Sequence, residues 1–167
     1  MSKIFITGSS DGLGQFTAKS LIELSHDVVL HARNSKRADD AMKNNPGAKA
    51  VLIADLSKMD ETIRLAEEVN KLGPFDVIIH NAGVYEASGE EIFSVNTLAP
   101  FVLTSLIEKP KRIIYLSSGM HLHGHFKPED FDSGNVSYSD SKLHVVMLSM
   151  AVAGKWKNVF SNAVNPG

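Results

Sequence analysis

The sequence contains no cysteine. Disulfide bonds, a catalytic thiolate and zinc sites with cysteine ligands are therefore excluded. This absence is compatible with a reducing compartment. The N-terminal residues show no basic segment followed by an apolar core, so we expect no signal peptide and a cytoplasmic protein.

The sequence also lacks long apolar runs and a large excess of charge of one sign. No run reaches the roughly 18 uninterrupted apolar residues of a spanning helix, so we expect no membrane segment. A formal net charge of −2 gives no electrostatic reason to expect a nucleic acid or an acidic membrane surface, because such partners need clustered Lys and Arg. With 43% hydrophobic and 22% charged residues, the chain fits one globular domain over residues 1–167.

Short β-branched or apolar runs alternate along the chain with longer segments of helical period. This order is typical of β-α units around a parallel sheet. Apolar residues at spacings of three and four predict helices within 13–24, 59–72, 95–106 and 143–150, and the polar region 34–48 is interpreted as a short surface helix with a turn. The predicted strands cover 3–7, 27–32, 49–53, 76–80, 112–117 and 159–164. We therefore predict a doubly wound parallel sheet in a three-layer α/β/α arrangement.

The stretch "TGSSDGLG", residues 7–14, follows the first predicted strand. A sharp turn from strand to helix needs a residue without Cβ at the turn, a second where backbone nears a diphosphate, and a third where helix meets strand. Gly8, Gly12 and Gly14 fit these positions in order. The free N–H groups at the start of the next helix favour an anion there.

At these residues the chain resembles the short-chain dehydrogenase/reductase family, whose cofactor motif is similar to "TGSSDGLG". Further similar motifs follow in the family's order: "ADL" at 54–56, "HNAG" at 80–83, "SVNTLAP" at 94–100, "IIYLSSG" at 113–119, "YSDSK" at 138–142 and "NPG" at 165–167. The resemblance spans the whole chain and implies a Rossmann fold. The wording around "SSGMHLHG" and "YSDSKL" is similar to the retinol-dehydrogenase-like branch.

Tyr138 and Lys142 are four residues apart, which places them on one face of a helix. An ammonium close to a tyrosine favours the phenolate and brings its pKa toward the working range. The resemblance implies that Tyr138 exchanges a proton with a carbonyl or alcohol substrate, that Lys142 also holds the nicotinamide ribose, and that Ser118 bonds the same substrate oxygen. It implies that Asn96 positions a water. Ser117 competes with Ser118 for the serine role, and a structural amide is the alternative for Asn96.

The resemblance also implies a dinucleotide cofactor, with Asp55 bonding the adenine amino group. After the second strand, Ala32 stands where an NAD-preferring site has an acid, and Arg33 follows, so we expect NADP(H) rather than NAD(H); the alternative is an exposed arginine at the start of a loop. The cofactor-binding residues implied are Gly8, Ser10, Asp11, Gly12, Leu13, Gly14, Arg33, Asp55, Leu56, Asn81, Ala82, Gly83, Tyr138, Lys142, Pro166 and Gly167.

The segment "HLHGH" contains His121, His123 and His125 at alternate positions. With no cysteine and no second cluster of ligands, we expect a loop at the substrate mouth rather than a metal site. His31 and His144 are interpreted as ordinary strand and helix residues.

The chain departs from the family pattern in two places. Only fifteen positions separate Asn81 from Asn96. The sequence ends at Gly167, before the helical lid and the last strand that the resemblance implies, so we expect a C-terminally truncated domain, or one part of a longer protein, rather than a natural minimal form. In this piece the sixth strand would be an open edge. The main hypothesis is an NADP(H)-dependent oxidoreductase that interconverts a carbonyl and an alcohol. The alternatives are a non-catalytic dinucleotide sensor or scaffold, and a nucleotide-sugar epimerase, which would need a larger C-terminal domain. The resemblance implies a homo-oligomer, a dimer or tetramer, formed through the helices that hold Asn96 and Tyr138.

Overall fold

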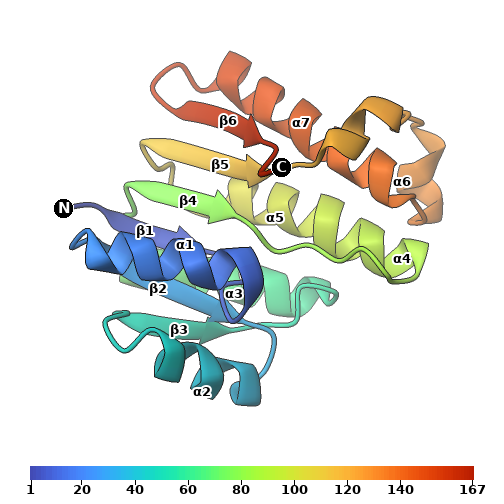
Figure 1. Ribbon diagram of the computed structural model, residues 1–167. Helices are drawn as coiled ribbons and strands as arrows, with labels where there is room; N and C mark the ends of the chain where they lie inside the picture. The colour runs from blue at the N-terminus through green and yellow to red at the C-terminus, as the bar shows by residue number, and fades with distance from the viewer.

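Six parallel strands form the centre of the molecule in the order β3-β2-β1-β4-β5-β6 (Figure 1). The computed structural model describes residues 1–167. The strands are β1 (Lys3–Ile6), β2 (Asp27–Ala32), β3 (Ala50–Ile53), β4 (Val77–His80), β5 (Arg112–Leu116) and β6 (Phe160–Val164). Each predicted strand is confirmed, and no predicted range exceeds the observed one by more than one residue.

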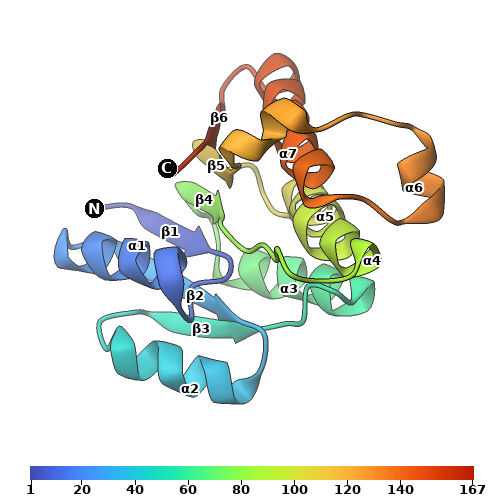
Figure 2. The ribbon, with the colours of Figure 1, turned by 45° about the vertical axis from the view of Figure 1, so that its right-hand side comes forward.

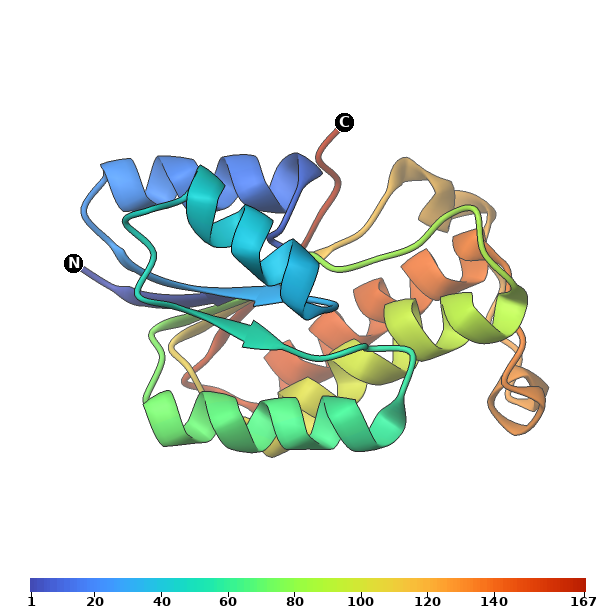
Figure 3. The same ribbon diagram turned by 90° about the horizontal axis from the view of Figure 1, so that it is seen from below.

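Helices cover both faces of the sheet, as the doubly wound prediction requires. The helices are α1 (Gly12–Glu23), α2 (Ser35–Asn44), α3 (Met59–Leu72), α4 (Gly89–Ile92), α5 (Ala99–Leu106), α6 (Glu129–Ser133) and α7 (Tyr138–Lys155), with a π-helical segment η1 (Phe93–Leu98) and a 3-10 helix η2 (Gly119–His123). Seen from below, α1 and α2 lie on one side of the sheet, and α3, α5 and α7 lie on the other (Figure 3). The fold is a three-layer α/β/α sandwich.

The predicted helix within 95–106 is confirmed, but its first part is π-helical and only its second part is α-helical. Residues 93–98 form a π-helical segment that continues α4 and runs directly into α5. A π turn contains an extra residue and is often found at functional sites. Here Asn96 in this segment is buried and hydrogen-bonded on both sides of its amide, to Val84 and to Ser141.

The core consists of two apolar layers separated by the sheet. Ile4 and Ile6 face the side of α1 and α2, and Phe5 between them faces α3 and α5, because successive strand residues point to opposite faces. All three are at most 3% exposed. The central strand β1 is therefore buried on both faces, as is typical of parallel sheets.

The strand order reverses at β1: β2 and β3 are added on one side of it, and β4, β5 and β6 on the other. β1 pairs with β2 on one side and with β4 on the other, so the loops that follow β1 and β4 separate and leave a crevice at the carboxyl end of the sheet. Figure 2 shows this end, with α6 and its flanking loops projecting from the body of the sheet. A binding cleft is expected at this position.

Of the two outer strands, β3 is mostly half-buried, whereas β6 is mostly exposed. β6 pairs with β5 alone, and Phe160 and Val164 on it are 67% and 41% exposed. The guanidinium of Arg112 lies 5.1 Å from the centre of the Phe160 ring and partly covers it.

Among the helices, none combines the length and the apolar character needed to cross a bilayer.

Candidate active site

A cleft of about 530 Å³ lies over the carboxyl ends of β1, β2, β4 and β5. The predicted cofactor-binding residues that line it are Gly8, Ser10, Asp11, Gly12, Leu13, Gly14, Arg33, Asp55, Leu56, Asn81, Ala82, Gly83, Tyr138, Lys142 and Pro166. Gly167 lies outside the lining. Of the predicted catalytic residues, Tyr138 and Lys142 line the cleft, whereas Asn96 and Ser118 do not.

The glycine turn forms the floor of the cleft. Gly8 and Gly12 have positive φ angles of 62° and 52°, which side chains disfavour. A Cβ at Gly8 would come within 2.8 Å of the Ala82 Cα, and one at Gly14 would overlap the Gly8 carbonyl and the Asn81 amide. The turn is therefore held against the end of β4 with no room for a side chain at either position.

Asn81 and Thr7 hold this turn in place. The Asn81 side-chain amide donates to the carbonyl oxygens of Thr7 and Gly8, at 3.0 and 2.8 Å. In return, the Thr7 hydroxyl accepts from the backbone N–H groups of Asn81 and Ala82. These four bonds join the loops after β1 and β4 at the point where the strand order reverses.

His31 supports the same turn from the other side, a role that the sequence analysis missed. Its Nδ1 accepts a hydrogen bond from the Gly8 N–H at 2.9 Å, and its Nε2 lies 3.0 Å from the Ala54 carbonyl oxygen, so Nε2 carries the proton. Burial lowers the pKa of His31 to about 4, which keeps the ring neutral and this tautomer in place. The available signal was a polar residue near the carboxyl end of a buried strand.

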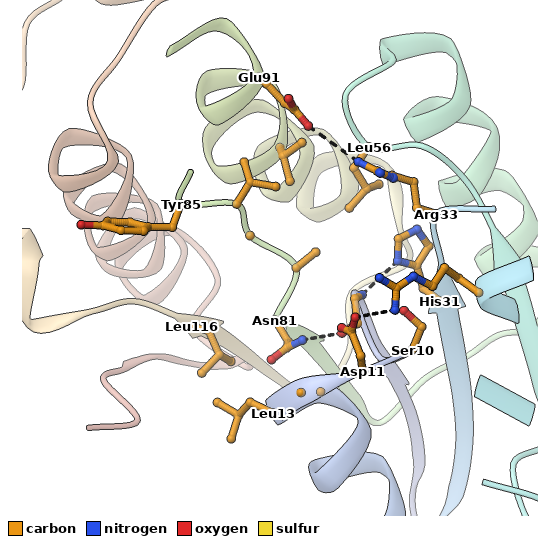
Figure 4. Close-up of a pocket in the computed structure, with 18 of the residues that line it drawn as sticks. Ser10, Asp11, Leu13, His31, Arg33, Leu56, Asn81, Tyr85, Glu91 and Leu116 are labelled. Carbon is orange, nitrogen blue, oxygen red and sulfur yellow. Dashed lines mark hydrogen bonds and ion pairs between the residues drawn. The ribbon is translucent and has the colours of Figure 1, made fainter. Parts of the chain in front are cut away.

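Two ion pairs lie in the part of the cleft beyond β2, which we call the arginine end; they are formed by Asp11, Arg33, Arg37 and Glu91. Arg37 Nη1 lies 2.7 Å from Asp11 Oδ2, and Arg33 Nη1 lies 3.7 Å from Glu91 Oε1. Figure 4 shows Glu91 extending from α4 toward Arg33, which follows β2. Arg37 and Glu91 were not predicted, because their elements meet only in the folded chain.

Tyr138 and Lys142 lie at the other end of the cleft, which we call the tyrosine end. Ser137 caps α7 in a reciprocal capping box with Asp140, so Tyr138 is the first helical residue and Lys142 lies one turn further on. The Lys142 Nζ lies 5.4 Å from the centre of the Tyr138 ring and donates to the Leu116 carbonyl oxygen at 2.9 Å. Burial lowers the pKa of Lys142 to about 8.

Asn96 lies behind this end rather than in it. Its Oδ1 accepts from the Val84 N–H at 2.8 Å, and its Nδ2 donates to the Val84 carbonyl and the Ser141 hydroxyl. A Cβ on Gly83 would lie 3.3 Å from Lys142 Nζ and 3.4 Å from Asn96 Oδ1, so only this glycine separates the two side chains. Asn96 thereby fixes the loop that borders Lys142.

The two candidate serines occupy different environments. Ser117 is buried, lines the cleft and donates its hydroxyl to the Lys142 carbonyl oxygen at 3.0 Å. Ser118 is partly exposed, and its hydroxyl oxygen accepts from the Met120 N–H at 3.2 Å at the start of η2. The Ser117 proton is thus committed to the backbone, whereas no acceptor in the chain takes the proton of Ser118.

Tyr85 also lines the cleft, which the sequence analysis did not predict. Its ring packs edge-on against Tyr138, with the ring centres 4.7 Å apart, and the residue is 60% exposed. None of His121, His123 and His125 lines the cleft, and the position of their loop at a substrate mouth stays a prediction. No group of three or more His, Asp or Glu side chains is arranged to hold a metal.

Comparison with known proteins identifies the family. The family model described as short chain dehydrogenase matches residues 2–167. The chain belongs to this family of oxidoreductases. An uncharacterized oxidoreductase of Emericella nidulans is 49% identical over all of this chain and 70% of its own length. Retinol dehydrogenase 14 of Mus musculus is 29% identical over 98% of this chain and 60% of its own length.

Solved structures agree with this assignment of the fold. The NADP active-site complex of RhlG from Pseudomonas aeruginosa superposes with a TM-score of 0.81 at 25% identity, covering 99% of this chain and 71% of that one. The predicted family and the predicted fold of this short-chain dehydrogenase are therefore both confirmed.

Proposed function

We propose that the protein is an NADP(H)-dependent oxidoreductase that interconverts a carbonyl and an alcohol, with Tyr138 as the general acid or base. The observation that carries the proposal is the position of Lys142. Its buried amine lies one helical turn from Tyr138 at the end of a cleft whose floor is a glycine turn. A buried amine without a carboxylate is costly, so its presence in a cleft favours a chemical role.

The residues present fit a nicotinamide dinucleotide. Gly12 lines the cleft with a positive φ angle, and a Cβ there would meet no atom of the chain within 4 Å, so this part of the backbone is open to a diphosphate. The cleft continues from this turn to the arginine end on one side and to the tyrosine end on the other. When bound, such a cofactor supplies the hydride.

The proposed proton path uses the chain's own groups. Tyr138 donates its phenolic proton to a substrate carbonyl oxygen, or removes one from an alcohol in the reverse direction. The Lys142 ammonium stabilises the phenolate that results, because a positive charge nearby favours the charged form of tyrosine. Ser118 remains the candidate second donor to the same oxygen, since its proton has no acceptor in the chain. Asn96 is a positioning residue for the loop beside Lys142.

The NADP(H) preference rests on Arg33. The residue follows Ala32 at the end of β2, lines the cleft, and its side chain is 63% exposed. Its guanidinium can therefore donate two hydrogen bonds to a phosphate. Arg33→Asp is expected to reverse this preference, because it places an acid where a ribose 2′-hydroxyl would bind. Titration of the protein with NADPH and NADH measures the ratio of the two dissociation constants.

The competing function is a non-catalytic dinucleotide sensor, and Tyr138→Phe distinguishes it from the enzyme. For the enzyme, removal of the hydroxyl should lower kcat/KM by at least about a hundredfold on a panel of ketones and aldehydes, with NADPH affinity nearly unchanged. Tyr85→Phe is the matched control, because it removes a hydroxyl from the neighbouring ring. Full activity of Tyr138→Phe would contradict the proposed acid, and no activity in the wild-type protein with intact NADPH binding would favour the sensor.

We also propose that copies of the chain associate through α5 and α7. Phe101 on α5 and Met147 and Met150 on α7 are 53%, 37% and 70% exposed, which leaves apolar area on both helices. The molecular mass in solution tests this proposal.

A further inference from the structure

The arginine end contains a carboxylate in addition to the arginine that would hold a phosphate. Glu91 Oε1 lies 3.7 Å from Arg33 Nη1, and both residues line the cleft. Their side chains are 38% and 63% exposed, so the pair is in contact with solvent and can open. Figure 4 shows the Glu91 carboxylate approaching Arg33 from the opposite side of the cleft.

Short, anchored elements hold Glu91 in this position. The chain has only a few residues between Val84, which is bonded to Asn96, and the start of α4, where Ser88 accepts a hydrogen bond from the Glu91 N–H at 3.2 Å. Ile92 and Phe93, which follow Glu91, are each 5% exposed and pack with Val136. The backbone of Glu91 is therefore fixed from both sides, and only its side chain is free to move.

We propose that Glu91 sets the cofactor preference by acting against Arg33, which rests on the proposed function of this cleft. A 2′-phosphate that binds Arg33 must displace the Glu91 carboxylate, because both anions compete for the same guanidinium N–H groups. A ribose 2′-hydroxyl carries no charge and can donate a hydrogen bond to the same carboxylate. Arg33 therefore favours NADP(H), and Glu91 reduces that preference.

The neighbouring residue Glu90 provides a matched control. Glu90 lies on the same short helix and carries the same charge. It borders an adjoining polar pocket with Arg33 and Glu91, but it does not line the cleft and forms no ion pair with Arg33 or any other residue. Removal of either charge changes the net charge equally. Only removal of Glu91 frees Arg33.

The test compares dissociation constants for NADPH and NADH in Glu91→Gln, Glu90→Gln and the wild-type protein at low ionic strength. In Glu91→Gln we expect NADPH to bind about three- to tenfold more tightly, with NADH unchanged or weaker, and this gain should shrink in high salt. Glu90→Gln should change the NADPH constant by less than about twofold, as expected for an unpaired surface charge.

A second comparison separates this inference from the function on which it rests. In an Arg33→Ala background, Glu91→Gln should lose most of its effect, because the carboxylate then has no guanidinium to compete for. An equal gain for NADPH and NADH, or an undiminished gain without Arg33, would overturn the role of Glu91 and leave the proposed oxidoreductase standing. If neither dinucleotide binds the wild-type protein, the proposed function fails and this inference fails with it.

Discussion

At the arginine end of the cleft, four charged side chains form two solvent-exposed ion pairs, whereas the tyrosine end holds one buried lysine bonded to a backbone carbonyl. Exposed pairs cost little to form and contribute little to stability. A buried amine loses its hydration, which is why the pKa of Lys142 falls to about 8. The charges at the arginine end are therefore exposed and paired, whereas the charge at the tyrosine end is buried and destabilised by its surroundings.

This difference shows where each end can be altered. Changes among exposed charges should act on ligand affinity, depend on salt and leave the fold intact. Changes to buried groups should act on the free energy of unfolding and depend on pH. The glycine turn is common to both ends, so a change there should affect the whole site.

The largest effect is expected for Gly14→Ala, which disrupts the glycine turn that borders both ends of the cleft. A methyl group at this position overlaps the Gly8 carbonyl and the Asn81 amide, so we expect a loss of about 2–4 kcal/mol in the free energy of unfolding and no measurable cofactor binding. Urea denaturation and a titration with NADPH measure the two effects.

The control for this change is Gly154→Ala in α7. A Cβ at Gly154 meets nothing within 4 Å, so an alanine there should stabilise the helix by about 0.5–1 kcal/mol. If the two alanines had similar effects, the close packing of the glycine turn would not matter for stability.

The next effect is the acid sensitivity of the buried histidines. Burial lowers the pKa of His80 to about 3 and that of His31 to about 4 from 6.5, so between these values and pH 6.5 the unfolded chain binds more protons and stability falls as pH falls. Each histidine should cost about 2 kcal/mol at pH 5. His80→Phe is expected to reduce the difference in unfolding free energy between pH 7.5 and pH 5 by this amount.

The exposed His123 is the control for that measurement. His123→Gln removes a histidine whose side chain is exposed, so no buried ring is lost. An equal response in both variants would indicate that burial of His80 does not govern the acid sensitivity.

A smaller effect is expected at the tyrosine end for Lys142→Met. The pKa of Lys142 is lowered from 10.5 to about 8, so the unfolded chain binds more protons between these values and the folded chain bears a penalty below pH 8. Removal of the amine should raise the free energy of unfolding by about 1–3 kcal/mol at pH 7, with the gain fading toward pH 10.5, while activity is lost. Lys155→Met, at the exposed end of the same helix, should stay within about 0.5 kcal/mol of the wild type.

The smallest effect is expected at the arginine end for Asp11→Asn. Asp11 and Arg37 are 62% and 51% exposed in their side chains, so breaking their pair should change stability by less than about 0.5 kcal/mol. Removing a carboxylate beside the glycine turn should tighten binding of either dinucleotide about threefold at low salt and hardly at all at high salt. A large loss of stability would show that the exposed pair contributes to the fold after all.

The parts of the fold that follow a repeating pattern could be predicted from the sequence. The strands and most helices carry an apolar period, and the glycine turn and the Tyr138–Lys142 pair lie within single local segments. The contacts of His31, Arg37 and Glu91 could not be predicted in this way, because each joins elements that are distant in the sequence and carries no period of its own. Asn96 and Ser118 were assigned to the site through the family resemblance; their side chains lie outside the cleft lining, and their roles stay predictions.

The π-helical segment has one more consequence, for the register of the two helices that it joins. An extra residue in a helical turn rotates everything before it relative to everything after it. In this chain the rotation lets α4 direct Glu91 over the cleft while α5 directs Leu103 into the core. We expect that deletion of one residue from 93–98 would give a continuous α-helix. Glu91 could then no longer face the cleft while Leu103 packs in the core.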